Sequence, residues 1–208
     1  MIINRYILGK YETNCYLLVD EKTKECAIID PGYVCDELDK EIERNNYCVK
    51  HIIFTHGHFD HIGGLEHCMS KYKNALVLMH NNDVEAILAG YDVFDVCMNN
   101  KENTVKSITL HADGDIFKLG DNELKVFHTP GHTKGGVCLY SDGILFSGDT
   151  LFKCSIGRTD FIDGDFNELK KSIMKLYEVL PDNTVVYPGH GECTTIAEEK
   201  VGNPFVRL

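Results

Sequence analysis

The chain contains no tryptophan, only 5 prolines among its 208 residues, and no apolar run long enough to cross a membrane. Its longest apolar runs, such as Ala75 to Met79 and Gly143 to Phe146, are far shorter than the roughly 20 residues of a transmembrane helix. No apolar segment typical of a signal peptide precedes Asp20. We therefore expect a cytoplasmic protein without a membrane partner.

Basic residues are scarce as well. The 21 Lys and Arg are outnumbered by 32 Asp and Glu, which gives a formal net charge of −11, and the basic residues form no run. Such a surface repels the phosphates of nucleic acids. We therefore expect no nucleic-acid partner.

The nine cysteines are odd in number and contain no C-x-x-C pair. In a chain without a visible export signal, they are expected to be reduced thiols that pack as small hydrophobic side chains. A disulfide framework is not expected, and nothing in the sequence indicates an oligomeric state.

The secondary structure is expected to be α/β, because short apolar runs bounded by turn residues alternate with segments of helical periodicity. Strands are expected at Ile2 to Leu8, Thr13 to Val19, Glu25 to Ile29, Val49 to Phe54, Ala75 to Met79, Ile116 to Lys118, Glu123 to His128, Val137 to Tyr140, Ile144 to Phe146 and Val185 to Tyr187. Helices are expected at Glu37 to Asn45, Gly64 to Tyr72, Asp83 to Ala89, Asp165 to Leu180 and Thr195 to Lys200.

No linker or low-complexity tract divides the chain, so we expect a single domain over residues 1–208. It would consist of two strand-rich halves, roughly residues 1–110 and 111–208. Strands with outer helices in both halves indicate two packed sheets that are covered by helices.

The most informative segment follows the expected strand at Val49 to Phe54. Within six residues it contains His56, His58, Asp60 and His61. On an extended or looped backbone, residues two apart point the same way. His56 and His58 could therefore bind one metal ion while Asp60 and His61 turn toward a second.

Three further turns each present one ligand-type side chain directly after an apolar strand: His132, Asp149 and His190. Loops at strand ends are where sites are commonly built. Together with the first segment they supply five histidines and two aspartates, enough for two ions. The other histidines lack glycine-rich context and are expected to be structural: His51, His67, His80, His111 and His128.

In their order along the chain, these seven residues resemble the signature of the metallo-β-lactamase fold superfamily. Within it, five segments are similar to the short glyoxalase II-like (hydroxyacylglutathione hydrolase-like) hydrolases: residues 148–152, 156–160, 188–191, 194–196 and 203–205. The resemblance implies an αββα four-layer sandwich, in which two mixed β-sheets are flanked by helices and the metals lie at one edge. It also implies that His56, His58 and His132 hold one ion, that Asp60, His61 and His190 hold the other, and that Asp149 bridges them.

The resemblance implies two divalent ions, with zinc expected and iron or manganese as alternatives. Two such ions, Asp60, Asp149 and a bridging hydroxide leave a net charge of about +1, which suits an anionic substrate. We therefore expect a dinuclear hydrolase that cleaves a small acyl-thioester by attack of the bridging hydroxide. Asp60 would also hold this hydroxide, and Lys153 and Arg158 are candidates for binding a substrate carboxylate.

Two alternatives share this pattern. One is a mononuclear iron persulfide dioxygenase, which also has the Gly-Arg-Thr-Asp segment found here at residues 157–160. The other is a metallohydrolase that cleaves a lactone or a phosphodiester. Dedicated metallo-β-lactamases usually lack a histidine at position 61, which disfavours a penicillin substrate. The C-terminal helical domain of glyoxalase II is not expected here.

Overall fold

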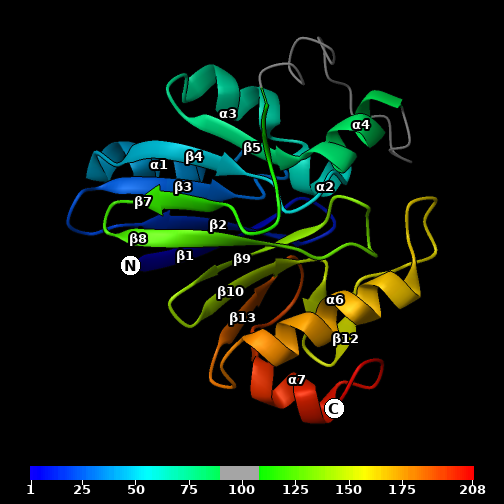
Figure 1. The fold of residues 1–208 in the computed structure, drawn as a ribbon. Helices are drawn as coiled ribbons and strands as arrows, with labels where there is room; N and C mark the ends of the chain where they lie inside the picture. The colour runs from blue at the N-terminus through cyan, green and yellow to red at the C-terminus, as the bar shows by residue number, and fades with distance from the viewer. Residues whose placement is uncertain (90–107) are drawn as a thin grey trace.

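The structure is a computed structural model that describes residues 1–89 and 108–208 (Figure 1). Its first sheet contains six strands in the order in which they occur along the chain: β1 (Ile2–Leu8), β2 (Thr13–Val19), β3 (Glu25–Ile29), β4 (Cys48–Ile53), β5 (Leu76–His80) and β6 (Thr109–His111). β1 to β3 pair antiparallel, and β3 to β6 pair parallel. The sheet is therefore mixed, as expected.

The second sheet is also mixed and comes from the later part of the chain. Its strands are β7 (Ile116–Leu119), β8 (Asn122–His128), β9 (Val137–Ser141), β10 (Ile144–Gly148), β13 (Val185–Pro188) and β14 (Thr194–Thr195). Their order in the sheet is β14-β13-β10-β9-β8-β7, and only β10 and β13 pair parallel. A separate hairpin is formed by β11 (Leu151–Phe152) and β12 (Ser155–Ile156).

Helices cover the outer face of each sheet (Figure 1). The helices are α1 (Asp36–Asn45), α2 (Phe59–Ile62), α3 (Leu65–Lys71), α4 (Asn81–Ala89), α6 (Phe166–Val179) and α7 (Ile196–Gly202). α1, α3 and α4 lie over the first sheet, and α6 and α7 lie over the second. The expected αββα four-layer sandwich is confirmed.

Side chains local in sequence define where the later helices begin. The Asp165 carboxylate accepts hydrogen bonds from the backbone N–H groups of Asn167 and Glu168 and so caps α6. At α7, Thr195 and Glu198 form a complete capping box. Both starts lie where the sequence predicts them.

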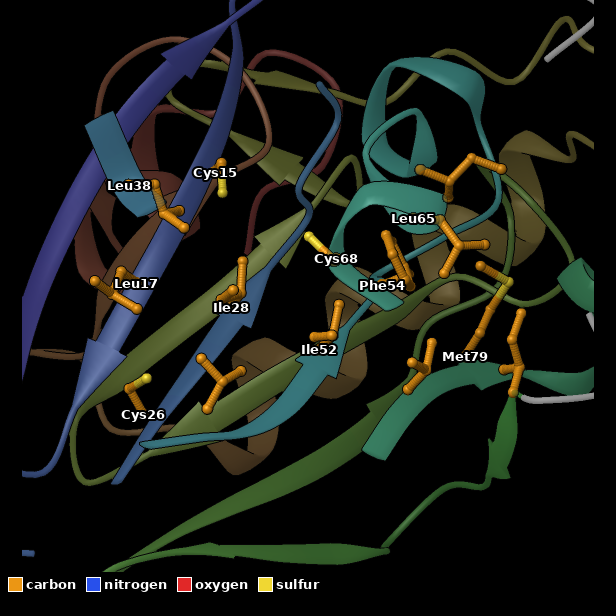
Figure 2. Close-up of a cluster of buried hydrophobic side chains, with 14 of the residues drawn as sticks. Cys15, Leu17, Cys26, Ile28, Leu38, Ile52, Phe54, Leu65, Cys68 and Met79 are labelled. Atoms are coloured by element: carbon orange, nitrogen blue, oxygen red, sulfur yellow. The ribbon is translucent and has the colours of Figure 1, made fainter. Parts of the chain in front are cut away.

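Three apolar layers hold the sandwich together. β2 is buried at all seven positions because both of its faces are covered. Leu17 packs with the layer under the helices, whereas Leu18 packs between the two sheets. Figure 2 shows the helix-side layer, which contains Ile28 and Ile52 from neighbouring strands and Leu65 of α3 beside Phe54.

The layer between the sheets gives a stability prediction. Leu139 in β9 is fully buried there. We expect Leu139→Ala to lower the free energy of unfolding by about 2–5 kcal/mol, because it removes apolar contacts and leaves a cavity. The exposed Leu76 is the matched control, and Leu76→Ala should change the free energy of unfolding by about 0.5 kcal/mol or less. Urea unfolding of both variants checks this, and equal effects would contradict it.

The elements that the sequence failed to predict are short: α2, β6, β11, β12 and β14. Segments of two to four residues are too short to show a periodicity. The eight cysteines that the structure describes are free thiols. Among the described residues, no helix has the length and apolar composition that crossing a bilayer would require.

Candidate metal centre

The seven predicted ligands come from four connections that each follow a strand. His56 and His58 lie between β4 and α2, while Asp60 and His61 lie in α2 itself. His132 follows β8, Asp149 directly follows β10, and His190 follows β13. Asp60 and His61 lie in a helical turn rather than on the extended or looped backbone from which the sequence argument starts.

The first group consists of His56, His58 and His132. Nδ1 of His58 lies 3.1 Å from Nε2 of His56 and 2.9 Å from Nε2 of His132. Zinc–nitrogen bonds of 2.0–2.1 Å place adjacent nitrogens of a tetrahedral site roughly 3.3 Å apart. Three imidazole nitrogens at this separation form a donor set that fits one divalent ion.

The second group consists of Asp60, His61 and His190. Nε2 of His190 lies 3.3 Å from Oδ2 of Asp60 and 3.4 Å from Nε2 of His61. The remaining pair, Nε2 of His61 and Oδ2 of Asp60, is 3.7 Å apart. This second set of donors therefore also converges on one point.

Asp149 lies between the two groups. Its Oδ2 is 3.5 Å from Nε2 of His132 and 3.6 Å from Nε2 of His190, and its Oδ1 is 3.4 Å from Nε2 of His61. Within the described part of the chain, this buried Oδ1 has no hydrogen-bond partner. Buried carboxylate oxygens rarely lack a partner, so the orphaned atom fits a position that faces a cation.

Hydrogen bonds at the outer ring nitrogens orient the histidines. Nδ1 of His132 lies 2.7 Å from the carbonyl oxygen of Arg158, and Nδ1 of His190 lies 3.0 Å from that of Tyr11. Nδ1 of His61 lies 3.0 Å from the Asp30 carboxylate. Because a carbonyl or carboxylate requires a donor, Nδ1 carries a proton in each of these three rings, and Nε2 faces the centre.

His56 is oriented through a relay. The Thr55 hydroxyl donates to Oδ2 of Asp30 at 2.6 Å, so its oxygen accepts from Nδ1 of His56 at 3.1 Å. The backbone N–H of Thr55 also donates to Asp30, at 2.7 Å. Asp30 therefore supports one histidine in each group, His61 directly and His56 through Thr55.

The electrostatics keep most of the donors deprotonated. Burial, with neighbouring imidazoles, lowers the pKa of His58 to about 3 and that of His56 well below its usual value. Burial alone would raise the pKa of Asp149, but the adjacent His61 holds it well below the usual range. Burial would also raise the pKa of Asp60, but the hydrogen bond from His190, the charge of His61 and the hydrogen bond from Thr13 together lower it. Such donors are ready to bind a cation at neutral pH.

His61 behaves differently. Burial lowers the pKa of His61, but the carboxylates of Asp149 and Asp30 outweigh burial and raise it well above its usual value. An ion bound at Nε2 of His61 has to displace this proton, so its binding is coupled to proton release.

The sequence of residues 8–190 matches the family model of the metallo-beta-lactamase superfamily. The chain belongs to this superfamily. It is 34% identical to hydroxyacylglutathione hydrolase GloC of Haemophilus influenzae over 207 residues, which cover 94% of this chain and 93% of that protein.

Two solved structures resemble this chain over nearly their whole length. BLEG-1 B3 metallo-beta-lactamase is 34% identical with a TM-score of 0.83 and covers 99% of both chains. TTHA1623, solved in a di-iron-bound form, is 29% identical with a TM-score of 0.80 and covers 98% of this chain and 100% of that one.

A cleft of about 700 Å³ opens beside the metallo-β-lactamase-type centre. Ligands of both groups line it, and four aromatic side chains form its apolar wall: Tyr11, Phe59, Phe152 and Phe161. The ring of Phe161 contacts both His58 and His132, with centroids 5.0 and 5.9 Å apart. The cleft therefore leads a substrate with an apolar part directly to the centre.

The two predicted substrate-binding residues lie in different places. Arg158 lines the cleft, donates to Asp160 from Nε at 2.9 Å and from Nη2 at 2.8 Å, and lies over the Phe161 ring. Lys153 is exposed, pairs with Glu192 at 2.6 Å and is not among the described residues that line this cleft.

Sequence reasoning missed several supporting residues. Thr13 donates to Oδ2 of Asp60 at 2.8 Å, and no sequence pattern indicates this role. Asp30 directly follows β3, the same signal that identifies Asp149, and could have been found. The five histidines expected to be structural lie outside the groups: His51, His67, His80, His111 and His128.

Proposed function

We propose that this protein is a dinuclear metallohydrolase that cleaves a small acyl-thioester of the hydroxyacylglutathione type. One observation carries the proposal: seven donor side chains form two adjacent groups that share Asp149, at the end of a cleft of about 700 Å³. The similarity to hydroxyacylglutathione hydrolase GloC over almost the whole chain supports the thioester.

In this proposal His56, His58 and His132 would hold the first ion, and Asp60, His61 and His190 would hold the second. Asp149 lies close to both groups and would help to hold both ions. Neutral imidazoles and carboxylates suit zinc, with iron or manganese as alternatives, and iron occupies the related TTHA1623. Two bound ions supply an acidified water at neutral pH and Lewis-acid polarisation of a carbonyl.

The chain's own residues position the reactants. Thr13 orients the ionised Asp60 by donating to its Oδ2 at 2.8 Å, and Asp60 lines the cleft, where it can accept a hydrogen bond from the attacking water. The aromatic wall excludes water from the acyl group, and Arg158 attracts a carboxylate of the substrate. No serine or cysteine nucleophile is required.

The test combines elemental analysis of the native protein with a substrate panel. Two ions per chain and thiol release from lactoylglutathione as the fastest reaction would support the proposal. One iron per chain with oxygen uptake on a persulfide would identify a dioxygenase instead. The panel also includes a lactone, a phosphodiester and, because of the similarity to BLEG-1, a β-lactam. Faster cleavage of any of these three would refute the thioester.

A prediction separates the two cationic residues. Arg158→Ala should raise KM for lactoylglutathione about 10-fold, equivalent to about 1.4 kcal/mol, with little change in kcat, because Arg158 would contribute binding away from the reacting bond. Lys153→Ala is the matched control and should leave KM unchanged. Steady-state kinetics of both variants check this, and an unchanged KM in Arg158→Ala would refute the role.

A further inference from the structure

Asp83 is a buried carboxylate that is not one of the seven donors. It is the third residue of α4 and is only 2% exposed. Its oxygens accept three hydrogen bonds: from the backbone N–H of Gly57 at 2.8 Å, the Thr133 hydroxyl at 2.9 Å and the backbone N–H of Gly135 at 2.6 Å. These bonds satisfy a group that would otherwise be costly to bury.

The three donors lie in the two loops that carry the first group of ligands. Gly57 lies between His56 and His58, and Thr133 directly follows His132. Oδ2 of Asp83 receives one hydrogen bond from each of these loops, so a single oxygen atom joins them. Asp83 makes no described hydrogen bond to α2, which carries Asp60 and His61, or to the connection that carries His190.

Close packing leaves this junction little freedom. A Cβ on Gly135 would lie 2.4 Å from Oδ1 of Asp83, and one on Gly57 would lie 3.2 Å from Cβ of Asp83. The helix that carries Asp83 is itself anchored, because Val84 and Ile87 are buried in the layer under the helices. Asp83 therefore holds both loops against a fixed support.

We propose that Asp83 is a positioning residue that sets the separation between His132 and the His56–His58 pair, and through it the affinity of the first group for its ion. The inference rests on the metal centre proposed above, but not on its substrate. Residues that position metal ligands typically change metal affinity 10–100-fold when substituted. The second ion should be insensitive to Asp83.

The chain offers a matched control in Asp39. This carboxylate is 6% exposed and likewise has three partners, in this case all side chains, namely His67, Tyr72 and Lys71. None of these residues belongs to the metal groups. Asp39→Asn therefore reports the general cost of neutralising a buried carboxylate in this fold.

The experiment measures zinc affinity for each group separately, by competition with a chromophoric chelator. In a His190→Ala background, only the three-histidine group remains complete, and adding Asp83→Asn should raise the Kd for zinc 10–100-fold. In a His58→Ala background, which leaves the second group complete, Asp83→Asn should change the Kd less than 2-fold. Asp39→Asn should change neither Kd, although it too lowers the melting temperature.

A milder variant keeps the inference testable if Asp83→Asn does not fold. Thr133→Val removes one of the three hydrogen bonds and should raise the Kd of the three-histidine group several-fold, with no effect on the other group. A purely structural role would be shown by a lower melting temperature with both Kd values unchanged, and equal weakening of both groups would also overturn the inference.

Failure of the inference and failure of the proposed function can be told apart. If the wild-type protein binds two zinc ions and Asp83→Asn weakens only one, the inference holds even if no thioester is cleaved. If the wild-type protein does not bind zinc at the three-histidine group, both are wrong.

Discussion

Asp149→Ala is expected to lower kcat/KM for thioester hydrolysis on the order of 10³-fold or more, because the Asp149 carboxylate lies close to both donor groups. Its oxygens are 3.4–3.6 Å from nitrogens of both groups, so the substitution should also reduce the metal content per chain. The fold should persist, because one of these oxygens makes no hydrogen bond within the described chain.

Steady-state kinetics, elemental analysis and circular dichroism of the same preparation check this prediction. The control is Asp121→Ala, which removes an exposed carboxylate in the turn between β7 and β8 that pairs only with Lys22 among the ion pairs of the described chain. It should keep full activity and both ions. A folded Asp149→Ala protein with more than a tenth of the wild-type kcat/KM would show that a shared carboxylate is not needed.

Removal of metal is the second change with a large expected effect. Exhaustive dialysis against a chelator should abolish hydrolysis, and adding back zinc, iron or manganese should restore it to an extent that identifies the preferred ion. The apo protein should remain folded, because none of the seven donors is part of its three apolar layers. Its melting temperature should fall, since an ion that binds only the folded state stabilises it by about 2.7 kcal/mol at a hundred times its Kd.

The measurement is a thiol-release assay run beside thermal unfolding, before and after dialysis. Dialysis against the same chelator presaturated with zinc is the control, and it should leave both activity and melting temperature unchanged. Full activity in a protein that elemental analysis shows to be free of metal would refute the proposed metal centre.

The strands and the ligand types were predictable from the sequence for local reasons. β1, β2 and β3 begin and end at the predicted residues, because apolar runs end at turn residues that cannot continue a strand. The donors were identifiable because imidazoles and carboxylates cluster after strands, where loops build sites. Helix starts at Asp165 and Thr195 were likewise marked by side chains that cap them.

Only the tertiary structure determines which residues from distant segments lie close together. The sequence could place His61 and Asp149 after strands of different sheets, but only the packing of the two sheets brings Nε2 of His61 to 3.4 Å from Oδ1 of Asp149. Arg158 and Lys153 looked equivalent, yet only Arg158 faces the cleft. Asp83 looked like an ordinary residue of a helix. Two of its three donors are backbone N–H groups, which almost any residue type can supply, so the sequence does not reveal them. Periodicity and turn chemistry are local properties of the chain, whereas the spacing of a metal centre depends on how its layers pack.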